Sequence, residues 1–126
     1  MPQPKVLIVD DDDDDRQSIA RYLKLEGFSC RTAATGTAGL DALLTDPPAA
    51  AILDFGLEPT SIDICRQVRA RPGTRNLNLL LFVLDKKGEA EAFAAGASGV
   101  IYKPFHLATI AARLRELVPG AADRQA

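Results

Sequence analysis

Residues 5–15 have the sequence KVLIVDDDDDD, in which a short apolar run leads directly into six consecutive aspartates. Residues 6–9 lack the alternation of polar and apolar side chains of a half-buried strand, so they predict a parallel strand that is covered on both faces. In open α/β sheets, ligands bind beyond the carboxyl ends of the strands. Carboxylates at this position therefore indicate a cation site, because hard oxygen ligands suit Mg²⁺.

The six aspartates have two interpretations. Aspartate is common at helix N-caps and in first helical turns, so an acidic loop that leads into a helix over residues 16–26 explains most of the run. Asp10 and Asp11 differ from the rest because they stand immediately at the end of the strand. We expect these two residues to belong to the cation site, and residues 12–15 to start the helix.

The composition limits the class of protein. With 126 residues, 47% of them hydrophobic and 25% charged, the chain matches one globular domain with its own core. A net charge of −2 leaves no basic surface, so we expect no nucleic-acid binding by this chain alone. The sequence shows neither a signal peptide nor a membrane span, which predicts a cytoplasmic location. Cys30, Cys65 and the single histidine, His106, form no zinc or disulfide pattern.

Short apolar runs alternate with helical patterns along the chain, which is typical of βα units and a parallel sheet. The predicted strands are residues 5–9, 28–33, 50–53, 77–84 and 100–101. The predicted helices are residues 16–26, 37–45, 62–69, 89–95 and 107–118. The predicted fold class is α/β, a doubly wound parallel sheet of five strands. Right-handed crossovers would place the carboxyl ends of all strands along one edge.

Ionisable residues follow three of these predicted strands: Asp10 and Asp11 the first, Asp54 the third and Lys103 the last. In a parallel sheet they would converge in one shallow pocket. Three carboxylates can hold a Mg²⁺ that keeps some of its waters, and a lysine beside them suits phosphate oxygens. Asp54 stands alone after the most buried strand, so it is the predicted nucleophile in the formation of an aspartyl-phosphate.

In these residues and in the motifs around them, the chain resembles the receiver domains of two-component response regulators, the CheY-like family. The matching stretches occur in family order and are KVLIVDD at 5–11, AILD at 51–54, AGASG at 95–99 and YKPF at 102–105. The resemblance covers residues 4 to about 118 and implies a flavodoxin-like (βα)5 fold. We expect an N-terminal extension at 1–4, a receiver domain at 5–118 and a C-terminal tail at 119–126.

The resemblance implies a role in phosphorelay signal transduction. A sensor histidine kinase or phosphotransfer protein would donate a phosphoryl group to Asp54. A downstream protein or a fused output domain would receive the signal, and a homodimer is left open. The chain would then be a phosphoacceptor rather than an enzyme, although one that can catalyse its own phosphorylation and dephosphorylation.

The resemblance also assigns the metal ligands. Asp11 and Asp54 would bind Mg²⁺ directly, together with the backbone carbonyl of Gly56, and Asp10 would act through water. Lys103 would contact the phosphoryl group. The proline that follows this lysine would be joined through a cis peptide bond.

The chain departs from the family at the residues that usually report phosphorylation. Receivers usually carry Ser or Thr at the end of the fourth strand, but residues 76–96 contain neither. The candidates for that place are Val83, Leu84 and Asp85. An aromatic residue usually stands three positions before the lysine, where this chain has Val100, and Tyr102 directly precedes the lysine. Both parts of the usual switch are therefore missing.

These departures keep a second function open, a degenerate pseudo-receiver that acts as a phosphorylation-independent protein-interaction module. A third, a Mg²⁺-dependent phosphohydrolase, needs an additional general acid and a cap, for which the chain is short. Two local hypotheses follow from the same residues. In the first, Glu58 reaches Lys103 and imitates a phosphorylated state. In the second, Asp85 repels an incoming phosphoryl group through its like charge.

Overall fold

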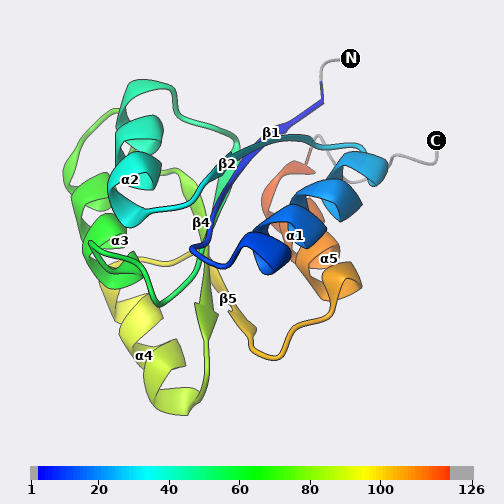
Figure 1. The fold of residues 1–126 in the computed structure, drawn as a ribbon. Helices are drawn as coiled ribbons and strands as arrows, with labels where there is room; N and C mark the ends of the chain where they lie inside the picture. The colour runs from blue at the N-terminus through cyan, green and yellow to red at the C-terminus, as the bar shows by residue number, and fades with distance from the viewer. Residues whose placement is uncertain (1–2, 120–126) are drawn as a thin grey trace.

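The computed structural model describes residues 3–119, and within them five parallel strands form one sheet that lies between two layers of helices (Figure 1). The strands are β1 (Lys5–Val9), β2 (Ser29–Ala33), β3 (Ala50–Leu53), β4 (Asn78–Val83) and β5 (Gly99–Tyr102). The helices are α1 (Asp13–Leu25), α2 (Gly36–Thr45), α3 (Ser61–Ala70), α4 (Lys86–Ala95) and α5 (Leu107–Leu117). The strand order is β2-β1-β3-β4-β5. This confirms the predicted α/β fold with its doubly wound parallel sheet.

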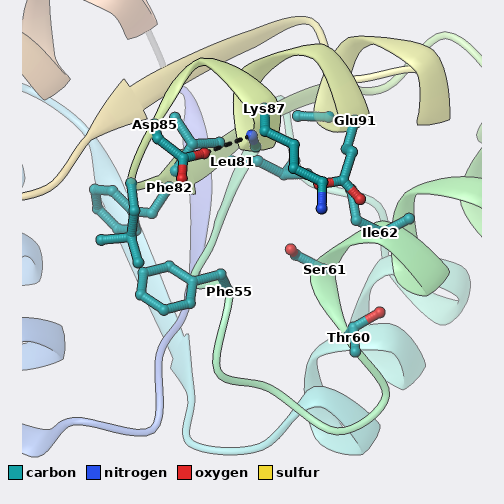
Figure 2. A pocket seen from close by; sticks show the side chains of 13 residues that line it. Phe55, Thr60, Ser61, Ile62, Leu81, Phe82, Asp85, Lys87 and Glu91 are labelled. Atoms are coloured by element: carbon teal, nitrogen blue, oxygen red, sulfur yellow. Dashed lines mark hydrogen bonds between the residues drawn. The ribbon is translucent and has the colours of Figure 1, made fainter.

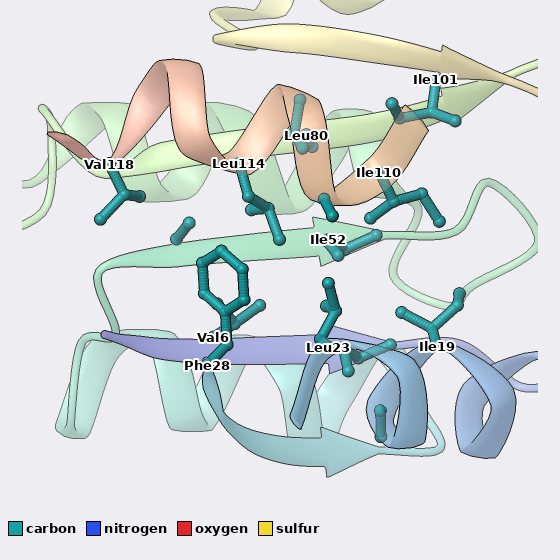
Figure 3. Close-up of a cluster of buried hydrophobic side chains, with 14 of the residues drawn as sticks. Val6, Ile19, Leu23, Phe28, Ile52, Leu80, Ile101, Ile110, Leu114 and Val118 are labelled. Carbon is teal, nitrogen blue, oxygen red and sulfur yellow. The ribbon is translucent and has the colours of Figure 1, made fainter. Parts of the chain in front are cut away.

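Each face of the sheet is covered by its own apolar layer. Helices α1 and α5 pack on one face, and α2, α3 and α4 pack on the other (Figure 1). Along β1, Val6 and Ile8 contribute to the layer with α1 and α5, whereas Leu7 and Val9 contribute to the opposite layer. Figure 3 shows the first of these layers. Burial on both faces explains why the strand is continuously apolar, since each such side chain stabilises the fold by about 1.5–3 kcal/mol.

Helix α1 begins at Asp13, three residues before the range 16–26 that its apolar periodicity predicts. Asp12 is its N-cap, and the Oδ1 of Asp12 accepts a hydrogen bond from the N–H of Asp15 at 2.8 Å. Residues 13–15 form an acidic first turn, which the positive end of the helix dipole favours. The expectation that residues 12–15 start the helix is therefore confirmed.

Helix α4 also begins three residues earlier than the predicted range 89–95. Asp85 is its N-cap, and its Oδ1 accepts a hydrogen bond from the N–H of Gly88 at 2.8 Å. The prediction was wrong here because the first turn is polar, and apolar periodicity does not detect such a turn. The side chain that was considered as a repulsive group is thus a helix cap.

Two expectations concern parts of the chain at its ends. The extension at 1–4 and the tail at 119–126 lie mostly outside the described residues.

Among residues 3–119, every helix falls short of the length and apolar character that a membrane span requires.

Candidate functional site

The register of the sheet brings the predicted site residues to one edge. In β1 and β3, Val9 pairs with Leu53, so the residues that follow the two strands start from the same level. The N–H of Asp54 donates to the carbonyl of Val9 at 2.9 Å. The N–H of Lys103 donates to the carbonyl of Val83 at 2.9 Å. These backbone hydrogen bonds fix the start of each loop independently of the side chains.

Three carboxylates form a compact cluster at this edge. Oxygens of Asp10, Asp11 and Asp54 all lie within 4.8 Å of one another. Asp10 is fully buried and Asp54 is 5% exposed, whereas Asp11 is exposed to solvent. Gly56 lies beside the cluster, because a Cβ at its position would be 3.8 Å from Oδ2 of Asp54. The structure therefore brings together all four residues of the predicted metal set.

The electrostatics of Asp10 show whether a divalent cation fits this cluster. Its Oδ1 accepts a hydrogen bond from the N–H of Asp12 at 2.9 Å. Its Oδ2 is buried and has no hydrogen-bond partner among the described residues. Burial raises the pKa of Asp10 to about 6, and the charge of Asp54 adds to this while the bond from Asp12 opposes it. A hydrated Mg²⁺ fits, because it would supply both the missing partner and the missing positive charge.

Lys103 completes the site from the end of β5. Its Nζ lies 2.8 Å from Oδ1 of Asp54 and 3.5 Å from Oδ2 of Asp15. The ammonium also lies over the rings of Phe55 and Phe82, at 5.3 and 5.1 Å from their centroids. Burial by itself would lower the pKa of Lys103, but the hydrogen bond and charge of Asp54 outweigh it and raise the pKa. The lysine is therefore held as a cation.

Asp15 contacts Lys103, which its predicted place at the start of the helix did not indicate. The predicted place is correct but incomplete. A signal was present in the spacing, because Ile19 is four residues further along and is fully buried. Residues four apart share one face of a helix, so Asp15 lies on the face that is turned towards the sheet.

The residues in the place of the usual switch have no hydroxyl group. Val83 is the buried last residue of β4, and Asp85 is occupied as the cap of α4. Leu84 lies between them and is 60% exposed. The hydroxyl of Tyr102 donates to the carboxylate of Glu89 on α4. The aromatic side chain beside the lysine therefore contacts the surface of α4.

The structure gives Lys103 other partners than Glu58. The ion pairs of Lys103 within residues 3–119 are those with Asp54 and Asp15. Glu58 is exposed, and a cis peptide bond joins it to Pro59. A second cis bond joins Lys103 to the proline that follows it, as the family resemblance implied.

A cavity of about 370 Å³ lies next to the site, between the N-terminal ends of α3 and α4 (Figure 2). Its lining includes Phe55, Ser61, Leu84 and Lys87. Figure 2 shows Asp85 above this space, with the hydrogen bond that caps α4. The loop after β4 therefore borders an open space and not a packed core.

Comparison with known sequences identifies the family. The sequence pattern of the response regulator receiver domain matches residues 6–115. The response regulator MprA of Mycolicibacterium vanbaalenii is 34% identical over 116 residues, which cover 90% of this chain and 50% of that protein. MprA of Mycobacterium tuberculosis strain H37Rv is 34% identical over 118 residues, with the same coverage. The chain thus spans about half the length of these curated relatives.

Solved structures lead to the same family. A putative response regulator from Chloroflexus aurantiacus is 29% identical, with a TM-score of 0.86 over 93% of this chain and 98% of that one. The chemotaxis response regulator CheY4 of Vibrio cholerae is 26% identical, with a TM-score of 0.85 over 91% of this chain and 98% of that one. The fold is thus the flavodoxin-like, CheY-type fold that the sequence predicted. Receiver domains are not classical enzymes, and they generally bind Mg²⁺ in an acidic pocket of this kind. The chain belongs to the response regulator receiver domain family.

Proposed function

We propose that the chain accepts a phosphoryl group on Asp54, with Mg²⁺ as cofactor, and passes the signal on through protein contacts. One observation carries this proposal. The carboxylates of Asp10, Asp11 and Asp54 cluster within 4.8 Å at the sheet edge, and the ammonium of Lys103 lies 2.8 Å from Asp54. This is a set of groups suited to phosphoryl transfer, in which catalysis depends on positioning and on charge neutralisation.

Each residue has a defined part in the proposed chemistry. Asp11 and Asp54 would hold Mg²⁺ with the backbone carbonyl of Gly56, and Asp10 would hold it through water. The bound cation would neutralise charge on the phosphoryl group. An oxygen of Asp54 forms the new bond to phosphorus while the bond from phosphorus to the donor breaks. Lys103 then binds an oxygen of the transferred group.

The partners and location follow from the same proposal. The phosphoryl donor would be a sensor histidine kinase or a phosphotransfer protein. The signal would pass to a downstream protein, to a fused output domain or to a second copy in a homodimer. The site would also catalyse its own phosphorylation from small donors and its own dephosphorylation. Such a pathway would place the chain in the cytoplasm.

Labelling with acetyl phosphate tests the proposal. The chain is incubated with acetyl phosphate and Mg²⁺, and its intact mass is measured. We expect the mass of one phosphoryl group to be added, to be lost in Asp54→Ala, and to be kept in Asp41→Ala. The control residue is an exposed aspartate of α2 outside the cluster. An unlabelled chain, or equal labelling of Asp54→Ala, would reject the proposal.

The pseudo-receiver is the second candidate function, and the absence of a hydroxyl at residues 83–85 favours it. Beryllofluoride, which imitates a phosphoryl group, distinguishes the two functions. Amide NMR shifts that extend from Asp54 to α4 and β5 support a phosphorylation-dependent signal. Shifts that stay within the loops at the sheet edge, although beryllofluoride binds, support the module that acts without phosphorylation.

A further inference from the structure

Asp15 differs from the other aspartates that open α1. Asp12 caps the helix through the N–H of Asp15, and Asp13 pairs with the arginine that follows the run. Asp14 is exposed and forms no ion pair or side-chain hydrogen bond within residues 3–119. The carboxylate of Asp15 instead lies 3.5 Å from the Nζ of Lys103. A role at the helix N-terminus alone therefore does not account for Asp15.

Lys103 is shared unequally between two carboxylates. Asp54, at 2.8 Å, is the closer partner, and its side chain is 7% exposed. The side chain of Asp15 is 37% exposed, so solvent screens its pair with Lys103 more strongly. The carboxylate of Asp15 nevertheless lies within ion-pair distance of Lys103, with its Oδ2 3.5 Å from Nζ. Two carboxylates thus lie within ion-pair distance of the same ammonium at the sheet edge.

We propose that Asp15 is a positioning residue that slows phosphoryl transfer to Asp54. It does so by holding the ammonium of Lys103 in an ion pair and away from the transferred group. This inference rests on the proposed function. In the transfer, an oxygen of Asp54 bonds to phosphorus, the bond from phosphorus to the donor breaks, and the leaving group takes the electron pair. Lys103 has to turn towards an oxygen of the transferred group. Asp15 opposes this step by holding the ammonium and by repelling the incoming anion.

Matched single substitutions test the inference. Asp15→Asn removes the charge at nearly constant size, and Asp14→Asn makes the same change on the same turn of α1, at an exposed residue that has no ion pair within residues 3–119. With acetyl phosphate and saturating Mg²⁺, we expect Asp15→Asn to be labelled about two- to fivefold faster than the unaltered chain. Asp14→Asn is expected to be labelled at the unaltered rate. Asp15→Glu keeps a carboxylate within reach of Lys103 and should restore the slow rate.

The outcomes separate this inference from the proposed function. Equal or slower labelling of Asp15→Asn, with the unaltered chain labelled, overturns the inference alone. Labelling of neither chain rejects the proposed function and the inference together. A Mg²⁺ titration of the same samples, followed by amide NMR shifts, provides a further check. A loss of Mg²⁺ affinity of about tenfold in Asp15→Asn would make Asp15 part of the metal site, and would overturn the positioning role.

Discussion

The Nζ of Lys103 lies 2.8 Å from the Oδ1 of Asp54, although the two residues follow strands that are not neighbours. β4 lies between β3 and β5, and neighbouring strands are about 4.8 Å apart, so the lysine side chain crosses the end of β4. The ammonium of Lys103 lies over the ring of Phe82, with Nζ 5.1 Å from the ring centroid. A long cationic side chain is therefore needed at this position.

The substitution Lys103→Met should destabilise the metal-free chain. It keeps most of the apolar length but leaves the carboxylate of Asp54, which is 5% exposed, without its cation. We expect a loss of about 2 kcal/mol in the free energy of unfolding, because an unpaired buried charge is costly. Urea denaturation at pH 7.5 in the presence of a chelator measures the change. Lys87→Met removes an exposed charge, and a similar loss in that control would contradict the explanation.

The substitution Asp10→Asn should stabilise the metal-free chain at pH 8. The Oδ2 of Asp10 is buried without a hydrogen-bond partner, and the negative charge of Asp54 lies close to it. Removing one of the two charges should raise the free energy of unfolding by about 1–2 kcal/mol. Asp14→Asn, which is exposed, should change it by no more than about 0.5 kcal/mol. Destabilisation by Asp10→Asn would show that the buried charge is compensated in another way.

The stability gained from Asp10→Asn should depend on pH. Because the folded chain holds the pKa of Asp10 at about 6, above its ordinary value of 3.8, the folded state binds more protons than the unfolded state between these two values. The contribution of Asp10 to stability is therefore fully present below pH 3.8 and is lost as the pH rises through 6. The difference between the two chains should thus shrink as the pH falls from 8 to 4. Thermal unfolding in a pH series measures it, and a constant difference would contradict the raised pKa.

Addition of Mg²⁺ should stabilise the chain through Asp11. At a concentration one hundred times its dissociation constant, a ligand that binds only the folded state adds about 2.7 kcal/mol. We expect Asp11→Ala to lose most of this gain. Without Mg²⁺ the same substitution should have little effect, because Asp11 is exposed. Calorimetry with and without Mg²⁺ tests both statements, and an undiminished gain in Asp11→Ala would exclude Asp11 as a ligand.

Asp12 and Asp14 should differ sharply in their effect on stability, because Asp12 is the N-cap of α1 and Asp14 lies in its first turn. Asp12→Ala removes the side chain that accepts from the N–H of Asp15 and should cost about 1 kcal/mol. Asp14→Ala removes an exposed aspartate of the first turn and should cost much less. Urea denaturation of the two variants provides the comparison. Equal losses would mean that the acidity of the turn matters more than the cap.

Local sequence predicted most of the fold because the physical signals of its elements are local. The continuous apolar run before Asp10 predicted β1 at residues 5–9, and the same kind of signal predicted β3 at 50–53. The start of α4 was placed three residues too late, because its polar first turn carries no apolar periodicity. Aspartate is a favoured N-cap, so Asp85 was the local signal for the start of this helix.

The βα alternation, the family motifs and the residue types at the sheet edge can all be read from local sequence. Which carboxylates share the cation of Lys103, and which of two adjacent aspartates is buried, depends on how the elements pack. Asp10 is enclosed and Asp11 is exposed although the two are chemically identical. The two differ because elements from other parts of the chain enclose one side chain and not the other. The local spacing of Asp15 and Ile19 indicates which face of α1 is turned towards the sheet, but the partner of Asp15 depends on the strand order, which brings Lys103 to the same edge.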